Sequence, residues 1–135
     1  MLVEICLTSN AMILGVEGAS HPLPAYLKSG VPIALATDDQ GVSRSDMTHE
    51  YLRAVETYGF SYPELKRMAR QSLEHSFLPG EGLFREGFQI VVKCAGDRGI
   101  RAKVSPTCQK FLDTSEKARQ QWELEKQFAS FEKKY

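Results

Sequence analysis

A chain of 135 residues with 42% hydrophobic content has room for one domain of ordinary globular composition. Seventeen basic and seventeen acidic residues cancel, so no net charge favours nucleic acid or an anionic membrane surface as a partner. The N-terminal stretch has no cationic segment, which argues against a signal peptide, and no apolar run is long enough to cross a bilayer. We therefore expect no nucleic-acid and no membrane partner, and the compartment stays open, since a parent protein could be cytoplasmic or exported.

Two short apolar runs each predict a β-strand. Residues Leu2–Thr8 and Val31–Thr37 are aliphatic and β-branched, and Gly, Pro, Ser and Asn bound them. The second run has almost no polar alternation, which is typical of a parallel strand buried on both faces. Between the runs, Pro22 suits a first helical turn and Gly30 suits the position after a helix, so the region predicts a strand, helix, strand unit.

Two helices are expected after the second strand. The first covers about residues 46–58 and carries one apolar face, made of Met47, Tyr51, Leu52, Val55 and Tyr58. The second begins at Ser61, where Glu64 completes a capping-box spacing, and runs until Pro79 and Gly80 end it.

The rest of the chain predicts a loop-rich segment and a helical tail. Repeated glycines in residues 81–112 favour loop, although the sequence FQIVV could form a strand there. Residues 113–135 predict a helix, because Asp113 and Glu116 have capping spacing and apolar residues recur at helical intervals. We therefore expect three segments, with a folded region over residues 1–80 preceding these two.

The three cysteines lack the close spacing of a zinc ribbon. Cys6 lies in an apolar run and is expected to be a small core residue. Cys94 and Cys108 could form a disulfide if the chain, or its parent, is exported. Their spacing alone does not decide whether they pair.

Asp38 and Asp39 are candidate functional residues because they directly follow the second predicted strand. Ligands and catalytic side chains gather at the C-terminal ends of parallel strands. Two adjacent carboxylates there need a cation or hydrogen-bond donors nearby, so a metal would hold Asp38 charged while Asp39 accepts from a ligand. The pair could instead cap a turn or the next helix, and the dipeptide alone favours that plainer interpretation.

Several short segments recur in the same order in the adenosine deaminase family. They are EICLTSN at residues 4–10, HPL at 21–23, SGVPI at 29–33, TDD at 37–39, EY at 50–51 and SLEHSFL at 72–78. Residues 2 to about 79 therefore resemble the C-terminal part of an adenosine deaminase. The segments SEKAR at 115–119 and QWE at 121–123 resemble those of longer bacterial members.

The resemblance implies an α/β fold, namely the C-terminal part of a metal-dependent-hydrolase TIM barrel with flanking helices and a helical tail. Leu2–Thr8 would be its seventh strand and Val31–Thr37 its eighth. Asp38 would then ligate Zn²⁺, and Asp39 would hydrogen-bond the purine ring of adenosine or deoxyadenosine. Zinc lowers the pKa of its bound water to about 7, and the hydroxide attacks the purine carbon that bears the amino group, which yields inosine and ammonia.

The remaining family residues match no position of this sequence. They are a His-x-His pair and a further histidine as zinc ligands, and a glutamate and a histidine that handle protons. His21, His49 and His75 lie in segments that the family uses as loop or helix, and we expect His21 to be a surface or capping residue. Gln40 stands where many relatives have proline, and Glu4 either supports a neighbouring ligand or faces solvent.

Two strands of an eight-stranded barrel would leave open edges. The expected functions are therefore an adenosine deaminase fragment that is inactive alone, a chain that complements a separate chain carrying the other strands, or an inert remnant that self-associates.

Overall fold

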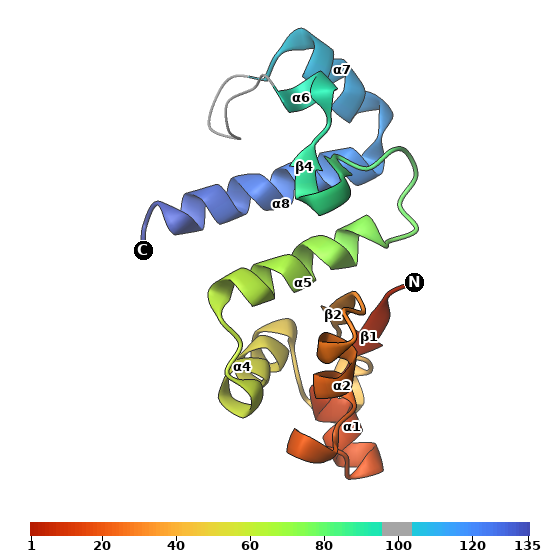
Figure 1. Ribbon diagram of the computed structural model, residues 1–135, viewed down its shortest axis with the longest axis vertical. Coiled ribbons are helices and arrows are strands. Elements are labelled where there is room, and N and C mark those ends of the chain that lie inside the picture. Colours follow the sequence, from red (N-terminus) through yellow and green to blue (C-terminus); the bar gives the residue numbers. More distant parts are fainter. Residues whose placement is uncertain (96–103) are drawn as a thin grey trace. The chain divides into compact units, whose positions relative to one another are not determined.

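The structure is a computed structural model that describes residues 1–95 and 104–135 (Figure 1). The chain forms two compact units, Met1–His75 and Ser76–Tyr135. Helices predominate over short strands in an α/β arrangement, and the described residues contain no closed barrel. No helix in the described part of the chain combines the length and the hydropathy needed to cross a membrane.

The first unit is built on a two-stranded parallel sheet. Its elements in chain order are β1 (Val3–Ile5), α1 (Leu7–Leu14), the 3-10 turn η1 (Gly18–Ser20), α2 (Leu23–Lys28), β2 (Ile33–Leu35), α3 (Gln40–Ser43), α4 (Met47–Tyr58) and α5 (Tyr62–Glu74). In the register of the sheet, Val3 lies opposite Ile33 and Ile5 lies opposite Leu35. The prediction of a parallel strand, helix, strand unit is therefore confirmed.

The first predicted strand, over Leu2–Thr8, is too long. The extended backbone ends at Ile5, and α1 begins two residues later. The residue before α1, Cys6, provides no side-chain cap, and the amide of Thr8 instead donates to the carboxylate of Glu50. A helix start stabilised by a residue so distant in sequence has no local signature, which is why the pattern of apolar residues was misleading here.

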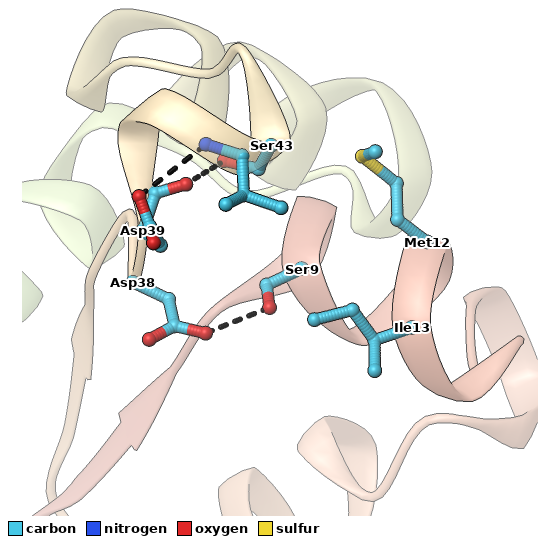
Figure 2. Close-up of a pocket in the computed structure, with 7 residues that line it drawn as sticks. Ser9, Met12, Ile13, Asp38, Asp39 and Ser43 are labelled. Atoms are coloured by element: carbon cyan, nitrogen blue, oxygen red, sulfur yellow. Dashed lines mark hydrogen bonds between the residues drawn. The ribbon is translucent and has the colours of Figure 1, made fainter.

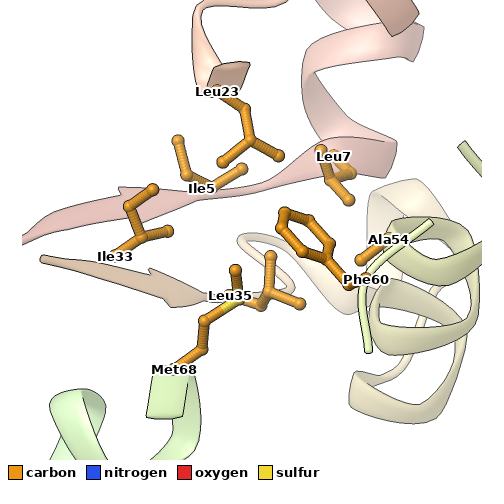
Figure 3. Packing of buried hydrophobic residues seen from close by; sticks show 8 residues of the cluster. All are labelled: Ile5, Leu7, Leu23, Ile33, Leu35, Ala54, Phe60 and Met68. Carbon is orange, nitrogen blue, oxygen red and sulfur yellow. The ribbon is translucent and has the colours of Figure 1, made fainter. Parts of the chain in front are cut away.

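The core of the first unit surrounds the sheet (Figure 3). Its buried members are Ile5, Leu7, Leu23, Ile33, Leu35, Ala54, Phe60 and Met68. Each large aliphatic or aromatic side chain removed from water in this way stabilises the fold by about 1.5–3 kcal/mol. The face predicted for residues 46–58 is only partly correct, because Leu52 is 52% exposed and the most buried positions of α4 are Glu50 and Ala54.

Local capping sets the limits of α5. The predicted capping box is present, with the Ser61 amide donating to Glu64 Oε2 at 2.8 Å. The helix ends at Glu74, earlier than the expected stop at Pro79 and Gly80, and His75 follows it as the C-cap residue. From α5, Gln71 Oε1 accepts the Ile33 amide of β2 at 3.1 Å, which pins the helix to the outer edge of the sheet.

The second unit contains more regular structure than the sequence predicted. Its elements are β3 (Phe84–Arg85), the 3-10 turn η2 (Glu86–Phe88), β4 (Gln89–Ile90), α6 (Val92–Ala95), α7 (Pro106–Thr114) and α8 (Glu116–Glu132). The expected loop-rich segment, residues 81–112, thus holds an antiparallel hairpin, α6 and most of α7. Within that segment, residues 96–103 lie outside the described residues.

Ser115 rather than Asp113 begins the C-terminal helix. Its side chain accepts the Ala118 amide at 3.1 Å and donates to the Glu81 carbonyl at 2.6 Å. Gly80 has φ +100°, and a Cβ there would lie 2.3 Å from Ser115 Oγ, so glycine is required at this close approach. The segment before β3 is therefore anchored at the start of α8.

A disulfide lies in the core of the second unit. Cys94 of α6 and Cys108 of α7 are bonded and fully buried. Around them lie Leu83, Phe84, Phe111, Leu112, Ala118 and Trp122. The pairing that the sequence left open is present in the structure, whereas Cys6 of the first unit is free and only half-buried.

Candidate functional site

Asp38 lies just beyond the C-terminal end of β2, beside the start of α1. Its backbone is in the left-handed region with φ 56°, a conformation that costs a residue other than glycine about 1–2 kcal/mol. The Ser9 hydroxyl donates to Asp38 Oδ2 at 2.8 Å (Figure 2). The segments that follow the two parallel strands are thus joined through these two side chains.

Asp39 caps the helix that follows. Its Oδ1 accepts the Gly41 amide at 3.1 Å and the Val42 amide at 3.3 Å, and its carbonyl accepts the Ser43 hydroxyl at 2.9 Å. The capping role considered for this pair of aspartates is therefore real for Asp39. A hydrogen bond from Asp39 to a purine stays a prediction.

Two hollows meet at Asp38. The larger, of about 370 Å³, is lined by Glu4, Cys6, Ser9, Asn10, Ile13, Leu14 and Asp38. The smaller, of about 20 Å³, is lined by Ser9, Met12, Ile13, Asp38, Asp39, Val42 and Ser43 and is shown in Figure 2. Met12, Ile13 and Val42 are exposed, so the carboxylate lies beside an apolar wall that is open to solvent.

Negative charge gathers at this end of the sheet. Burial raises the pKa of the Cys6 thiol. Three nearby carboxylates raise it further, those of Asp38, Glu50 and Glu4. In the absence of a cation, the Cys6 thiol therefore keeps its proton near neutral pH. A cation would, however, be attracted by the carboxylates.

His21 is buried, and the expectation of a surface position is wrong. The residue is 3% exposed, and Nδ1 accepts the Leu23 amide at 3.0 Å, so the expected capping role is present. Nε2 has no partner in the described part of the chain, and burial lowers the pKa of the imidazole. His49 on α4 and His75 after α5 are exposed.

The described residues of this chain do not fit a zinc site by themselves. Catalytic zinc has three protein ligands and an open position. Among residues 1–95 and 104–135, no group of three or more His, Cys, Asp or Glu side chains is placed to hold a metal ion. His21 is directed to the Leu23 amide, which leaves Asp38 as a single well-placed donor.

Ser9 belongs to the site, and Glu50 holds the adjacent first turn of α1, but neither residue was identified from the sequence. The partner of Ser9 depends on the register that brings the ends of β1 and β2 together. Glu50 is 0% exposed, and its signal was an acidic residue on the same helical face as Met47, Tyr51 and Ala54. Asp38 and Asp39 were identified because they directly follow a strand that the apolar run Val31–Thr37 predicts.

Comparison with known proteins gives a consistent match. A family model described as adenosine deaminase matches residues 1–85. The adenosine deaminase of Escherichia coli (strain SE11) is 39% identical over 80 residues, which cover 58% of this chain and 24% of that protein. The adenosine deaminase of Shewanella loihica is 40% identical over 77 residues, covering 56% and 23%. The chain thus spans about a quarter of the length of these curated relatives, and no solved structure matches it significantly.

Proposed function

Because this chain belongs to the adenosine deaminase family, we propose that it supplies the Asp38–Asp39 edge of a zinc-dependent adenosine deaminase site. The reaction is the hydrolytic deamination of adenosine or deoxyadenosine to the inosine product and ammonia. In this proposal β1 and β2 are the seventh and eighth strands of a TIM barrel. Because the described residues hold no group of three metal-binding side chains, the proposal takes the other zinc ligands and the proton-handling groups from the rest of the barrel, and the chain alone is expected to be inactive.

The observation that carries the proposal is the state of the Asp38 carboxylate. Ser9 holds Oδ2, and Oδ1 accepts no hydrogen bond from the described residues. The left-handed backbone at this position is the kind of strain that proteins retain at functional sites. An oriented, half-satisfied carboxylate at the end of a parallel strand is suited to ligate one face of a metal ion.

Asp39 combines capping with substrate recognition in this proposal. Its Oδ1 is occupied by the Gly41 and Val42 amides, whereas Oδ2 has no partner among the described residues. That oxygen is an available acceptor for the exocyclic amino group of the purine, which carries the only N–H bonds of the adenine base. The exposed apolar side chains of Met12, Ile13 and Val42 offer an aromatic ring a surface to pack on.

A chimeric enzyme tests the assignment. Residues 1–85 of this chain replace the matching segment of the Escherichia coli adenosine deaminase, and adenosine loss and bound zinc are measured. We expect zinc-dependent turnover, and we expect the Asp38→Ala chimera to lose both zinc and turnover. A chimera that keeps full zinc and rate without Asp38 removes this residue from the metal site.

The Asp39→Asn chimera separates substrate binding from capping. Asparagine keeps an oxygen for the Gly41 and Val42 amides but replaces the second acceptor with a donor. We expect zinc to remain and kcat/KM to fall by about 10- to 100-fold, as for loss of a hydrogen bond to a charged group. Unchanged kinetics would leave Asp39 with its capping role alone.

A binding role is the second candidate. The sheet of the first unit has two strands, and neither outer edge is paired with another strand in the described residues. Unpaired strand edges accept strands from other chains. Sedimentation of the 135-residue chain, alone and mixed with the N-terminal three quarters of the Escherichia coli relative, measures this directly. A complex with activity supports complementation, a homo-oligomer without activity supports self-association, and a monomer in both samples contradicts the binding role.

A further inference from the structure

Glu50 is the most deeply buried carboxylate of the first unit, and the proposed chemistry does not use it. It lies on α4 with 0% exposure. Both of its oxygens accept the Thr8 amide at 3.3 Å, and Oε1 also accepts the Ser45 hydroxyl at 2.9 Å. A buried charge is tolerated only when hydrogen bonds replace its water. These donors come from the first turn of α1 and from the segment before α4, so one side chain ties three parts of the fold.

The carboxylate of Glu50 caps the N-terminus of α1. The first amides of a helix have no partner inside the helix, and a negative charge there is favourable. Cys6, the residue that precedes α1, makes no side-chain cap. Glu50 therefore satisfies this helix start from 42 positions away in the sequence.

The same helical turn carries the residue that holds Asp38. Ser9 follows Thr8 directly, is 7% exposed, and donates to Asp38 Oδ2. Ser45 adds a further link, because its hydroxyl lies 3.4 Å from Thr8 Oγ1 as well as contacting Glu50. A displacement of the first turn of α1 thus moves the donor that orients the Asp38 carboxylate.

We propose that Glu50 is a positioning residue for Asp38, because it accepts the Thr8 amide and thereby holds Ser9 where its hydroxyl meets Asp38. The importance of an oriented Asp38 rests on the proposed function, but the positioning itself is a property of this chain. Glu50 touches neither the hollows nor Asp38 and acts through α1.

The test uses NMR of the full 135-residue chain without metal or nucleoside. Hydrogen exchange at the Thr8 amide reports the Glu50 contact, and the carboxyl-carbon resonance of Asp38 reports the Ser9 contact. Ser9→Ala defines the resonance of Asp38 without its donor. In Glu50→Ala we expect Thr8 exchange to be at least about tenfold faster, as for loss of a hydrogen bond to a charged group. We also expect the Asp38 resonance to move toward the Ser9→Ala value.

Two further variants make the result specific. Glu50→Gln keeps an oxygen for the Thr8 amide and should restore the Asp38 resonance to near its wild-type value. Ala54→Gly lowers the stability of the same helix at another buried position and should leave that resonance unchanged. If Glu50→Ala does not fold, Glu50→Asp takes its place, because the shorter side chain withdraws the carboxylate from Thr8 while keeping the charge.

The proposal is overturned if the Thr8 amide loses protection while the Asp38 resonance stays at the wild-type value, since Glu50 would then only stabilise the fold. It is equally overturned if Ala54→Gly shifts Asp38 as much as Glu50→Ala does. An additional shift in the double variant Ser9→Ala/Glu50→Ala would show that Glu50 acts on Asp38 by another route and would contradict the role of Ser9. None of these readouts depends on zinc or turnover, so an inactive chimera refutes the proposed function and leaves this result standing.

Discussion

Ser9 and Asp38 are 29 residues apart in sequence and share a hydrogen bond of 2.8 Å that joins the segments leaving the two parallel strands. A partner of this kind fixes the direction of a ligating carboxylate, and its loss typically lowers metal affinity by about 10- to 100-fold. In the Escherichia coli chimera we therefore expect Ser9→Ala to weaken zinc binding by at least about tenfold. Competition with a chelator measures the zinc affinity of each chimera. Ser72→Ala is the control, because this serine is exposed and should leave the affinity unchanged.

The left-handed backbone of Asp38 predicts an inverted order of stability for two substitutions. At φ 56° glycine avoids a cost that alanine bears, so Asp38→Gly should be more stable than Asp38→Ala by about 1 kcal/mol. At the exposed Lys110, in the middle of α7, the order should be the ordinary one, with alanine more stable than glycine by about 1 kcal/mol. Urea denaturation of the four variants gives both differences, and the same order at both sites would contradict the conformation of Asp38.

His21 predicts a loss of stability in mild acid. Burial lowers the pKa of its imidazole below the ordinary 6.5 in the folded chain, so the unfolded chain binds the proton more readily. The contribution of the neutral ring is therefore complete above about pH 6.5 and declines as the pH falls toward the folded pKa. Protonation also removes Nδ1 as acceptor for the Leu23 amide.

Unfolding free energies at about pH 7.5 and about pH 5 measure this effect. His21→Asn keeps an acceptor but cannot titrate, so its loss between the two pH values should be smaller than that of the wild type. The exposed His49→Asn should behave as the wild type does. Equal losses in wild type and His21→Asn would show that carboxylates alone cause the acid sensitivity.

Because of the disulfide, we expect the stability of the second unit to depend on the oxidation state of its two cysteines. Loss of the Cys94–Cys108 bond should destabilise that unit by about 2–4 kcal/mol. Trp122 is the single tryptophan and lies in the same core with 5% exposure, so its fluorescence reports unfolding of this unit.

Reduced wild type and the double variant Cys94→Ala/Cys108→Ala should both unfold at lower denaturant than the oxidised wild type. Cys6→Ala is the control, because this thiol belongs to the other unit and is free. Coincident fluorescence transitions for the oxidised and reduced chain would show that the bond contributes nothing.

The sequence predicted those parts of the fold whose signals are local. The apolar run over Val31–Thr37 gave the buried strand, and the Ser61 and Glu64 spacing gave the start of α5. The helix α7 also has a local signal that was overlooked, since Ser105 caps it and Pro106 occupies its first turn. The repeated glycines earlier in residues 81–112 favoured loop for the whole segment and hid this helix start.

The parts of the fold and of the site that the sequence did not predict depend on tertiary contacts. α1 begins where Glu50 supplies its cap, and residues near α1 in the sequence contain no trace of this. For the site, adjacency in sequence brought Asp38 and Asp39 together, whereas Ser9 joins them only through the register of the sheet. Family resemblance suggested roles for the two aspartates, which stay predictions, but it did not indicate the side chains that hold them.

The contact between Ile33 and Gln71 limits which edge of the sheet can accept a further strand. In a parallel pair, alternate residues direct their amides toward the partner strand, so Ile33 and Leu35 of β2 face outward. Gln71 already occupies the Ile33 amide. A foreign strand therefore finds only Leu35 available within β2, too short a template for fibril growth. In this conformation a further strand docks more readily along β1, and closing the proposed barrel at β2 requires Gln71 to release the Ile33 amide.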